Sequence, residues 1–311
     1  MASSSSLRTS AASSSVPVPT SSSLGEYSDV SEFFTSLRLK YVSVSVLASV
    51  SVKGRVCVRA TLRREPVNAM NLEVWRELAA FLEAAESRED VEGVVFSSGL
   101  TRPIFTAGND LSELHAKRTT RARFEEFWKV SNGFLVRLLR SRLATVAAVQ
   151  GSCPAGGCVM ALCCDTIVMV DRNGRIGLNE VALGIAVPMY WARLFARRTG
   201  EARGEALLAR AALLRASEAH SAGLVDILVS SREELLPAAE RILAKLALSA
   251  LRGGRVATKT AVRGAIANEW AAAIPIEATQ VWDILSAKST VAALDASMQA
   301  LQKKGPARPR L

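Results

Sequence analysis

Three short segments of the 311-residue chain combine residue types that could bind and transform a ligand. The first, Phe105-Thr-Ala-Gly-Asn-Asp-Leu111, follows an expected strand over residues 91–97. The second, residues 151–158, holds a proline and paired glycines between an expected strand and an expected helix. Such a turn presents free N–H groups at the start of the helix, and these can stabilise an oxygen that gains negative charge. Close packing of the helix on the sheet explains the glycines equally well.

The third segment, Gly177-Leu-Asn-Glu-Val-Ala-Leu-Gly-Ile185, places one carboxylate, that of Glu180, among apolar side chains. Loss of hydration disfavours the ionised form of a carboxyl group and moves its pKa towards neutrality, where it becomes a competent base. A glutamate on a surface turn is the simpler interpretation of this segment alone. Its combination with the other two segments favours the catalytic interpretation.

The elements expected around these segments alternate strands with helices as far as residue 179. Alternating and continuous apolar runs predict the strands, and a period of 3.6 residues predicts the helices. This alternation favours a parallel sheet with right-handed crossovers, so the expected fold class is α/β, followed by an almost wholly helical C-terminal part. The expected strands cover residues 41–46, 55–62, 91–97, 145–150 and 166–170, and the expected helices cover residues 71–85, 121–141, 155–164, 189–199, 202–214, 217–222, 233–251, 255–271 and 277–302.

Composition divides the chain into four parts. The first 25 residues are serine-rich and acid-poor, so residues 1–38 are interpreted as an organelle transit peptide or a disordered N-terminal extension. We therefore expect import into the mitochondrial matrix. Residues 39–250 are expected to form the α/β core, residues 251–304 a helical C-terminal region, and residues 305–311 a basic tail.

The charge and cysteine content limit the classes of partner and cofactor. Lysine and arginine number 39 against 29 acidic residues, and this net charge of +10 favours anionic partners without choosing among them. Hydrophobic residues make up 49%, which excludes a wholly disordered protein, and no stretch reaches the roughly 20 apolar residues of a membrane span. Five cysteines without a C-x-x-C pair, together with two histidines, offer few ligands for zinc. The glycine-rich turn lacks the G-x-G-x-x-G order, so a nicotinamide cofactor is not expected.

Four ordered motifs give residues 53–304 a resemblance to the crotonase (enoyl-CoA hydratase/isomerase) superfamily, and most of all to its Δ3,Δ2-enoyl-CoA isomerase branch. The resemblance implies a crotonase-like ββα superhelical core with a helical C-terminal trimerisation region. The motifs are Val67-Asn-Ala-Met-Asn71, Phe105-Thr-Ala-Gly-Asn-Asp110, Pro154-Ala-Gly-Gly-Cys158 and Gly177-Leu-Asn-Glu180, and the later Ile284-Leu-Ser-Ala-Lys-Ser289 resembles the isomerase branch in particular.

The resemblance implies a catalytic arrangement. The backbone N–H groups of Ala107 and Gly156 would form an oxyanion hole for the thioester oxygen of an acyl-CoA, and Glu180 would be the catalytic acid–base. Hydratases of the superfamily use a second glutamate, and Val159 stands at that position here. One carboxylate can move a proton from C2 to C4, whereas adding water calls for two. The implied function is isomerisation of 3-enoyl-CoA to 2-trans-enoyl-CoA in fatty acid β-oxidation.

The resemblance also implies partners. The acyl-CoA thioester is the substrate, no metal or redox cofactor is implied, and the expected assembly is a homotrimer. Lys259 would approach the 3′-phosphate of CoA. The residues implied in substrate and CoA binding are Arg63, Ala69, Asp110, Leu111 and Lys259.

Three alternatives stay open at this stage. The chain could catalyse another acyl-CoA reaction on the same fold, such as hydration. It could serve as a structural subunit of a larger mitochondrial complex, in which case Glu180 would be shut off from any pocket. RNA binding would need a contiguous basic stripe, and because the basic residues are scattered along the sequence, a nucleic acid partner is not expected.

Overall fold

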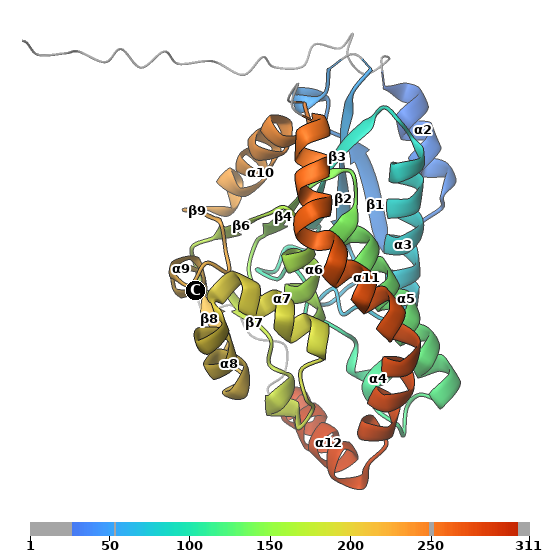
Figure 1. Ribbon diagram of the computed structural model, residues 1–311, viewed down its shortest axis with the longest axis vertical. Helices are drawn as coiled ribbons and strands as arrows, with labels where there is room; N and C mark the ends of the chain where they lie inside the picture. Colours follow the sequence, from blue (N-terminus) through green and yellow to red (C-terminus); the bar gives the residue numbers. More distant parts are fainter. Residues whose placement is uncertain (1–26, 53, 249–251, 304–311) are drawn as a thin grey trace, which may run out of the picture.

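The computed structural model describes residues 27–52, 54–248 and 252–303. Within them a six-stranded sheet has helices on both faces (Figure 1). The strand order is β1-β2-β3-β4-β6-β9, in which β1 is antiparallel to β2 and every other neighbouring pair is parallel. The α/β fold class is thus confirmed. The strands are β1 (Val42–Val46), β2 (Val56–Leu62), β3 (Val91–Ser98), β4 (Ala144–Val149), β6 (Thr166–Val170) and β9 (Ile227–Val229).

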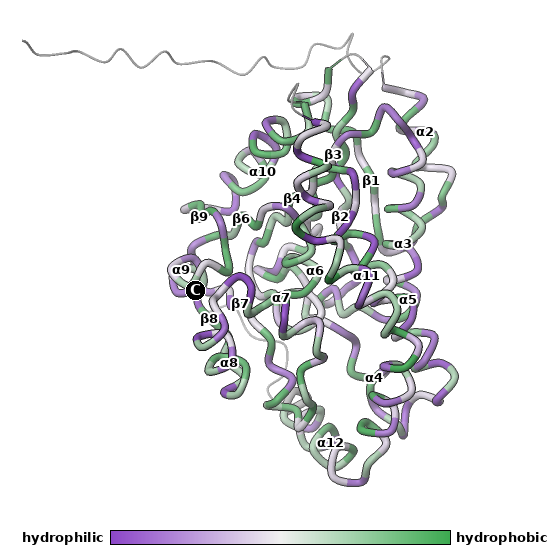
Figure 2. Tube along the Cα trace, in the orientation of Figure 1, coloured by the Kyte–Doolittle hydropathy of each residue, from purple (hydrophilic) through white to green (hydrophobic). Residues whose placement is uncertain are grey.

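Side chains of the sheet enter two cores, because successive residues of a strand face opposite sides. The helices that cover the sheet are α3 (Leu72–Ser87), α5 (Arg121–Arg140), α6 (Gly156–Cys163) and α10 (Arg232–Ala247). Val94 and Phe96 of β3 lie in the core shared with α3, α5 and α6, whereas Val95 lies in the core shared with α10. Helix α10 alternates hydrophilic and hydrophobic residues along its turns, as expected for one face against a sheet (Figure 2).

A three-stranded sheet in the order β5-β7-β8 joins two of the segments singled out by the sequence. Its strands are β5 (Cys153–Pro154), β7 (Arg175–Gly177) and β8 (Leu214–Arg215). Pro154 pairs with Gly177 in parallel, so the glycine-rich turn lies beside the segment that contains Glu180. The short helices are η1 (Ala48–Val50), α4 (Leu111–Leu114), η2 (Glu180–Leu183), α7 (Met189–Thr199), α8 (Glu201–Ala209) and α9 (Ala216–Ser221).

Two C-terminal helices, α11 (Arg252–Leu285) and α12 (Lys288–Lys303), complete the described chain. Helix α11 packs along α5, and α12 lies against η2 at one end of the molecule (Figure 1). The break expected between residues 271 and 277 is wrong, because α11 continues through Pro275 and ends at Leu285. The side chains of Ile274 and Ala278, before and after the proline, are both buried. The helix therefore packs against the core on both sides of Pro275.

The N-terminal helix and the last strand of the large sheet also differ from the sequence-based expectations. Helix α2 (Ser28–Ser36) buries Val30 and Phe34 in the core, so the expected N-terminal extension of residues 1–38 is wrong at its C-terminal end. Strand β9 was also not expected, because three residues are too few to show an alternating pattern. The remainder of the expected extension, residues 1–26, and the expected basic tail lie outside the described residues. Among those that are described, no helix has the length and apolar character needed to cross a bilayer.

Candidate active site

A cavity of about 620 Å³ opens beside η2 and is lined by residues from all three chemistry-bearing segments. Its walls also include side chains of α5, α7, α11 and α12. Most of the lining side chains are apolar, so a charged group inside the cavity is poorly solvated. The cavity brings together five of the predicted site residues, namely Ala69, Ala107, Asp110, Leu111 and Glu180.

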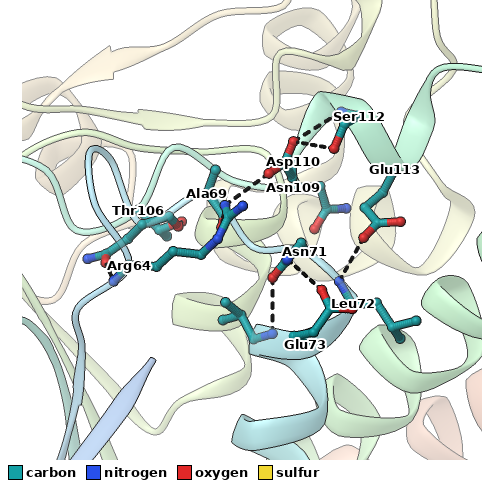
Figure 3. A network of polar contacts seen from close by, with 12 residues as sticks. Arg64, Ala69, Asn71, Leu72, Glu73, Thr106, Asn109, Asp110, Ser112 and Glu113 are labelled. Atoms are coloured by element: carbon teal, nitrogen blue, oxygen red, sulfur yellow. Dashed lines mark hydrogen bonds and ion pairs between the residues drawn. The ribbon is translucent and has the colours of Figure 1, made fainter. Parts of the chain in front are cut away.

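Residues 67–71 and 105–111 run side by side along one wall of the cavity (Figure 3). The Met70 N–H donates to the Gly108 carbonyl at 2.8 Å, and the Asp110 N–H donates to the Met70 carbonyl at 3.0 Å. These bonds hold two motifs that are remote in sequence in a fixed register.

An ion pair reinforces the same wall. Arg64 Nη1 lies 2.9 Å from Asp110 Oδ2 and donates to the Ala69 carbonyl at 2.6 Å (Figure 3). Asp110 Oδ1 accepts hydrogen bonds from the N–H and the hydroxyl of Ser112, at 3.0 and 2.8 Å. Burial raises the pKa of Asp110, but the bonds from Ser112 and Arg64 outweigh it and leave this pKa below its usual value. Asp110 is therefore a fixed anion that holds the loop.

The oxyanion-hole donor expected at Ala107 is wrong. The Ala107 N–H donates to the Val67 carbonyl at 2.9 Å and so faces the neighbouring segment. Gly108 has a φ of 83°, and the backbone of Met70 is hydrogen-bonded to the Gly108 carbonyl and to the Asp110 N–H, which flank Asn109. The Asn109 N–H therefore points away from residues 67–71. Among the described residues no group accepts the Asn109 N–H. The free donor of this segment is therefore two residues later than expected.

The second expected donor, the N–H of Gly156, lies at the first position of α6, where a helix leaves its N–H groups without internal partners. The preceding residue, Ala155, has a φ of 52°, a conformation that costs a non-glycine residue on the order of 1–3 kcal/mol. Two backbone bonds maintain it: the Ala155 N–H donates to the Gly177 carbonyl at 2.9 Å, and the Ala155 carbonyl accepts the Val159 N–H at 3.1 Å.

Both glycines of the turn are needed for the close approach of the two donor-bearing segments. A Cβ on Gly156 would lie 2.7 Å from Asn109 Oδ1, and a Cβ on Gly157 would lie 2.4 Å from Thr106 Cγ2. Distances this short do not occur for real Cβ atoms, so a larger residue at Gly156 or Gly157 would displace the side chain of Asn109 or Thr106. The paired glycines therefore leave room for the Asn109 and Thr106 side chains beside α6.

Glu180, the first residue of η2, carries a buried carboxyl group with no partner. Its side chain lines the cavity, the residue is 7% exposed, and neither carboxyl oxygen has a hydrogen-bond partner within the described part of the chain. Burial raises the pKa of Glu180 from 4.5 to about 7. A carboxyl group with this pKa can both accept and return a proton near neutral pH. The neighbouring Asn179 Oδ1 is also buried, and no described residue donates a hydrogen bond to it.

The cavity offers one base of this kind. The other acid that lines it, Asp110, is paired with Arg64 and has a lowered pKa. Val159, at the position of the second hydratase glutamate in the resemblance, is fully buried in α6 and carries no acid. The arrangement therefore suits transfer of a single proton beside a stabilised oxyanion. Among the described residues no group of histidine, cysteine and acidic side chains could hold a metal ion.

Two predicted CoA-binding residues do not line the cavity. Arg63 is exposed, and its side chain has no contact that assigns it to the site. Lys259 is 8% exposed, and its Nζ lies 2.8 Å from Asp165 Oδ1 and donates to the Leu143 carbonyl at 3.1 Å. Burial lowers the pKa of Lys259, and Asp165 opposes this effect. Within this chain Lys259 therefore neutralises Asp165 and is not available to a ligand.

The far wall of the cavity carries two tryptophan side chains. The rings of Trp128 and Trp191, from α5 and α7, stack at a centroid distance of 6.0 Å. Trp191 Nε1 donates to Asn132 Oδ1 at 3.1 Å, which fixes its ring. Val281 and Leu285 of α11 line the same cavity. Their apolar helical patterns were visible in the sequence, but such patterns do not distinguish a ligand cavity from a core.

Comparisons with known proteins agree with this geometry. A family model described as enoyl-CoA hydratase/isomerase matches residues 52–306. The chain is 37% identical over 169 residues to "Enoyl-CoA delta isomerase 1, mitochondrial" of Mus musculus, a match that covers 54% of this chain and 57% of that protein. The corresponding Homo sapiens protein is 36% identical over 174 residues, covering 55% of this chain and 56% of that protein. The chain thus matches somewhat more than half the length of these relatives.

A solved structure extends the similarity to the fold. The crystal structure of human mitochondrial delta3-delta2-enoyl-CoA isomerase superimposes with a TM-score of 0.79 at 29% identity, covering 86% of this chain and 100% of that chain. A probable enoyl-CoA hydratase of Rhizobium meliloti is 30% identical over 196 residues, covering 62% of this chain and 74% of that protein. Relatives therefore include both an isomerase and a hydratase.

Proposed function

The chain belongs to the enoyl-CoA hydratase/isomerase family, and on that premise we propose that it isomerises 3-enoyl-CoA thioesters to 2-trans-enoyl-CoA thioesters. One observation carries the proposal: within the described part of the chain the buried carboxyl group of Glu180 has no partner, and it lines the same cavity as Asn109, whose side chain lies against Gly156. Similarity to the named isomerases and the absence of an acid at Val159 support it.

In the proposed reaction Glu180 removes a proton from C2 of the substrate. The C–H electron pair forms a double bond between C1 and C2, and negative charge moves onto the thioester oxygen. The N–H groups of Asn109 and Gly156 stabilise this dienolate, and one such donor is typically worth about 3–4 kcal/mol. Protonated Glu180 then returns the proton to C4, which leaves the C2–C3 double bond. This sequence balances without a metal or redox cofactor.

The wider context of the proposal follows the relatives. Exposed Arg63 stays the candidate for contact with the phosphates of CoA. We expect a homotrimer, because Val262 and Ile276 of α11 are 55% and 62% exposed and large apolar side chains gain from burial between subunits. The word mitochondrial in the names of the relatives supports a mitochondrial address, and we propose the matrix and a role in fatty acid β-oxidation.

Substitution of Glu180 tests the proposal directly. The variant Glu180→Gln keeps the shape of the side chain but cannot accept the C2 proton, so isomerisation of trans-3-hexenoyl-CoA should fall at least about 100-fold. The control is Glu89→Gln, because Glu89 is exposed and does not line the cavity. This control should keep its activity. Substantial turnover by the Glu180 variant would contradict the assignment.

Hydration is the second candidate, since several relatives are named as hydratases. The same preparation should be assayed for water addition to 2-hexenoyl-CoA. We expect isomerisation to exceed hydration by a wide margin, because the second acid that lines the cavity, Asp110, is paired with Arg64 and is not free to help Glu180 position a water molecule. Faster hydration than isomerisation would reverse the assignment. The structural-subunit alternative predicted a Glu180 shut off from any pocket, and the cavity gives it no support.

A further inference from the structure

The side chain of Asn109 is held in one orientation by a tryptophan. Trp75 Nε1 lies 3.2 Å from Asn109 Oδ1, and an indole nitrogen is a donor only. The atom that faces Trp75 must therefore be the amide oxygen, which settles the usual ambiguity between the oxygen and nitrogen of an asparagine. Trp75 itself is fully buried on α3 and packs against Phe134 at a ring distance of 5.6 Å. A rigid part of the core thus fixes the amide.

The amide nitrogen that remains belongs to a side chain that lines the cavity and lies close to Gly156. Asn109 lines the cavity, and among the described residues nothing accepts a hydrogen bond from its Nδ2. A Cβ built on Gly156 would lie 2.7 Å from Asn109 Oδ1 and 3.4 Å from Nδ2. The carboxamide group of Asn109 therefore lies against the Cα atom of Gly156, whose N–H is the other backbone donor.

We propose that Asn109 supplies two donors to the thioester oxygen, its backbone N–H and its side-chain amide, so that the oxyanion hole has three donors in all. This inference rests on the proposed isomerase function. A neutral amide suits the role for two reasons. Its hydrogen bond to the thioester oxygen becomes stronger as negative charge develops on that oxygen, and the amide carries no charge that must be buried in the free enzyme. Its orientation is set before substrate arrives, so the reaction does not have to order it.

The variant Asn109→Leu separates the side chain from the backbone. It keeps the backbone N–H and removes the amide, so kcat for trans-3-hexenoyl-CoA should fall about 100-fold while KM changes a few-fold at most. Exchange of the C2 proton with deuterated water should slow in parallel, because formation of the dienolate is the step that the amide assists. Circular dichroism and thermal denaturation establish that the variant is folded.

The variant Trp75→Phe tests how the amide is positioned. It removes the indole donor but leaves the amide in place, so kcat should fall less than in Asn109→Leu. In the double variant the Trp75 substitution should cause no further loss of kcat, because there is no amide left to orient. If both side chains were merely structural, their effects would instead multiply and appear as lower melting temperatures.

The outcomes separate this inference from the proposed function. An inactive wild-type protein would contradict the isomerase assignment itself. An active wild type together with an Asn109→Leu variant whose kcat stays within threefold would overturn the inference alone. If Asn109→Leu does not fold, the Trp75→Phe variant decides: a reduced kcat with unchanged KM supports the inference, and an unchanged kcat overturns it.

Discussion

Replacing the buried carboxyl group of Glu180 should stabilise the protein at the same time as it removes activity. The folded chain holds Glu180 in an apolar cavity where none of the described residues pairs with its carboxyl group, whereas the unfolded chain exposes it to water. The ionised form therefore costs free energy only in the folded state. In the variant Glu180→Gln the side chain is neutral at every pH, and this cost disappears.

The magnitude follows from the two pKa values. Glu180 titrates at about 7 in the folded protein and at its ordinary value of 4.5 when exposed, a gap that corresponds to about 3 kcal/mol. Between pH 4.5 and 7 the folded state keeps a proton that the unfolded state has lost. Unfolding then releases a proton, so the stability of the wild type falls as the pH rises through this window. Above pH 7 the full penalty is present.

Thermal denaturation at pH 5 and pH 8 measures the effect. We expect the Gln variant to melt roughly 6 °C above the wild type at pH 8 and close to it at pH 5. Glu89→Gln is the control, because Glu89 is exposed and its substitution should change neither value. An advantage of the Gln variant that is equal at both pH values would refute the reasoning, and so would a Gln variant that is less stable at pH 8.

Two further predictions concern the pH profile and the buried cations. The reaction needs ionised Glu180, so kcat/KM should rise about tenfold per pH unit below 7 and level off above it; a pH–rate profile that is flat from pH 5 to 9 would contradict this. Asp165→Asn leaves Lys259 and Arg263 without their counter-charge and should cost about 3–5 kcal/mol in urea denaturation, and a loss below about 1 kcal/mol would contradict it.

The sequence was sufficient to predict most of the strands and the place of the base. The strand expected at residues 166–170 is confirmed to the residue, and the strand expected at 91–97 is one residue longer in the structure. Buried parallel strands read as short apolar runs, which is a local signal. The apolar neighbours of Glu180 predicted its burial for the same reason, and the structure gives a raised pKa.

What the sequence could not predict depends on contacts between remote residues. Whether Ala107 or Asn109 offers a free N–H depends on a register with residues 67–71 and on the positive φ of Gly108. The partner of Lys259, Asp165, is 94 residues away in the chain, so no local pattern shows that the lysine is already paired. Both expectations came from the resemblance to a family, which does not show the contacts that each residue makes in this chain.

Helix α11 contacts both the buried Asp165 cluster and the cavity that contains Glu180. Near its start Lys259 and Arg263 are bound to Asp165, and near its end Val281 and Leu285 form part of the cavity wall. The helix continues through Pro275 without interruption, so the residues bound to Asp165 and the residues that line the cavity belong to one helix. Heat resistance, through the Asp165 cluster, and acyl-chain fit, through Val281 and Leu285, thus both depend on α11.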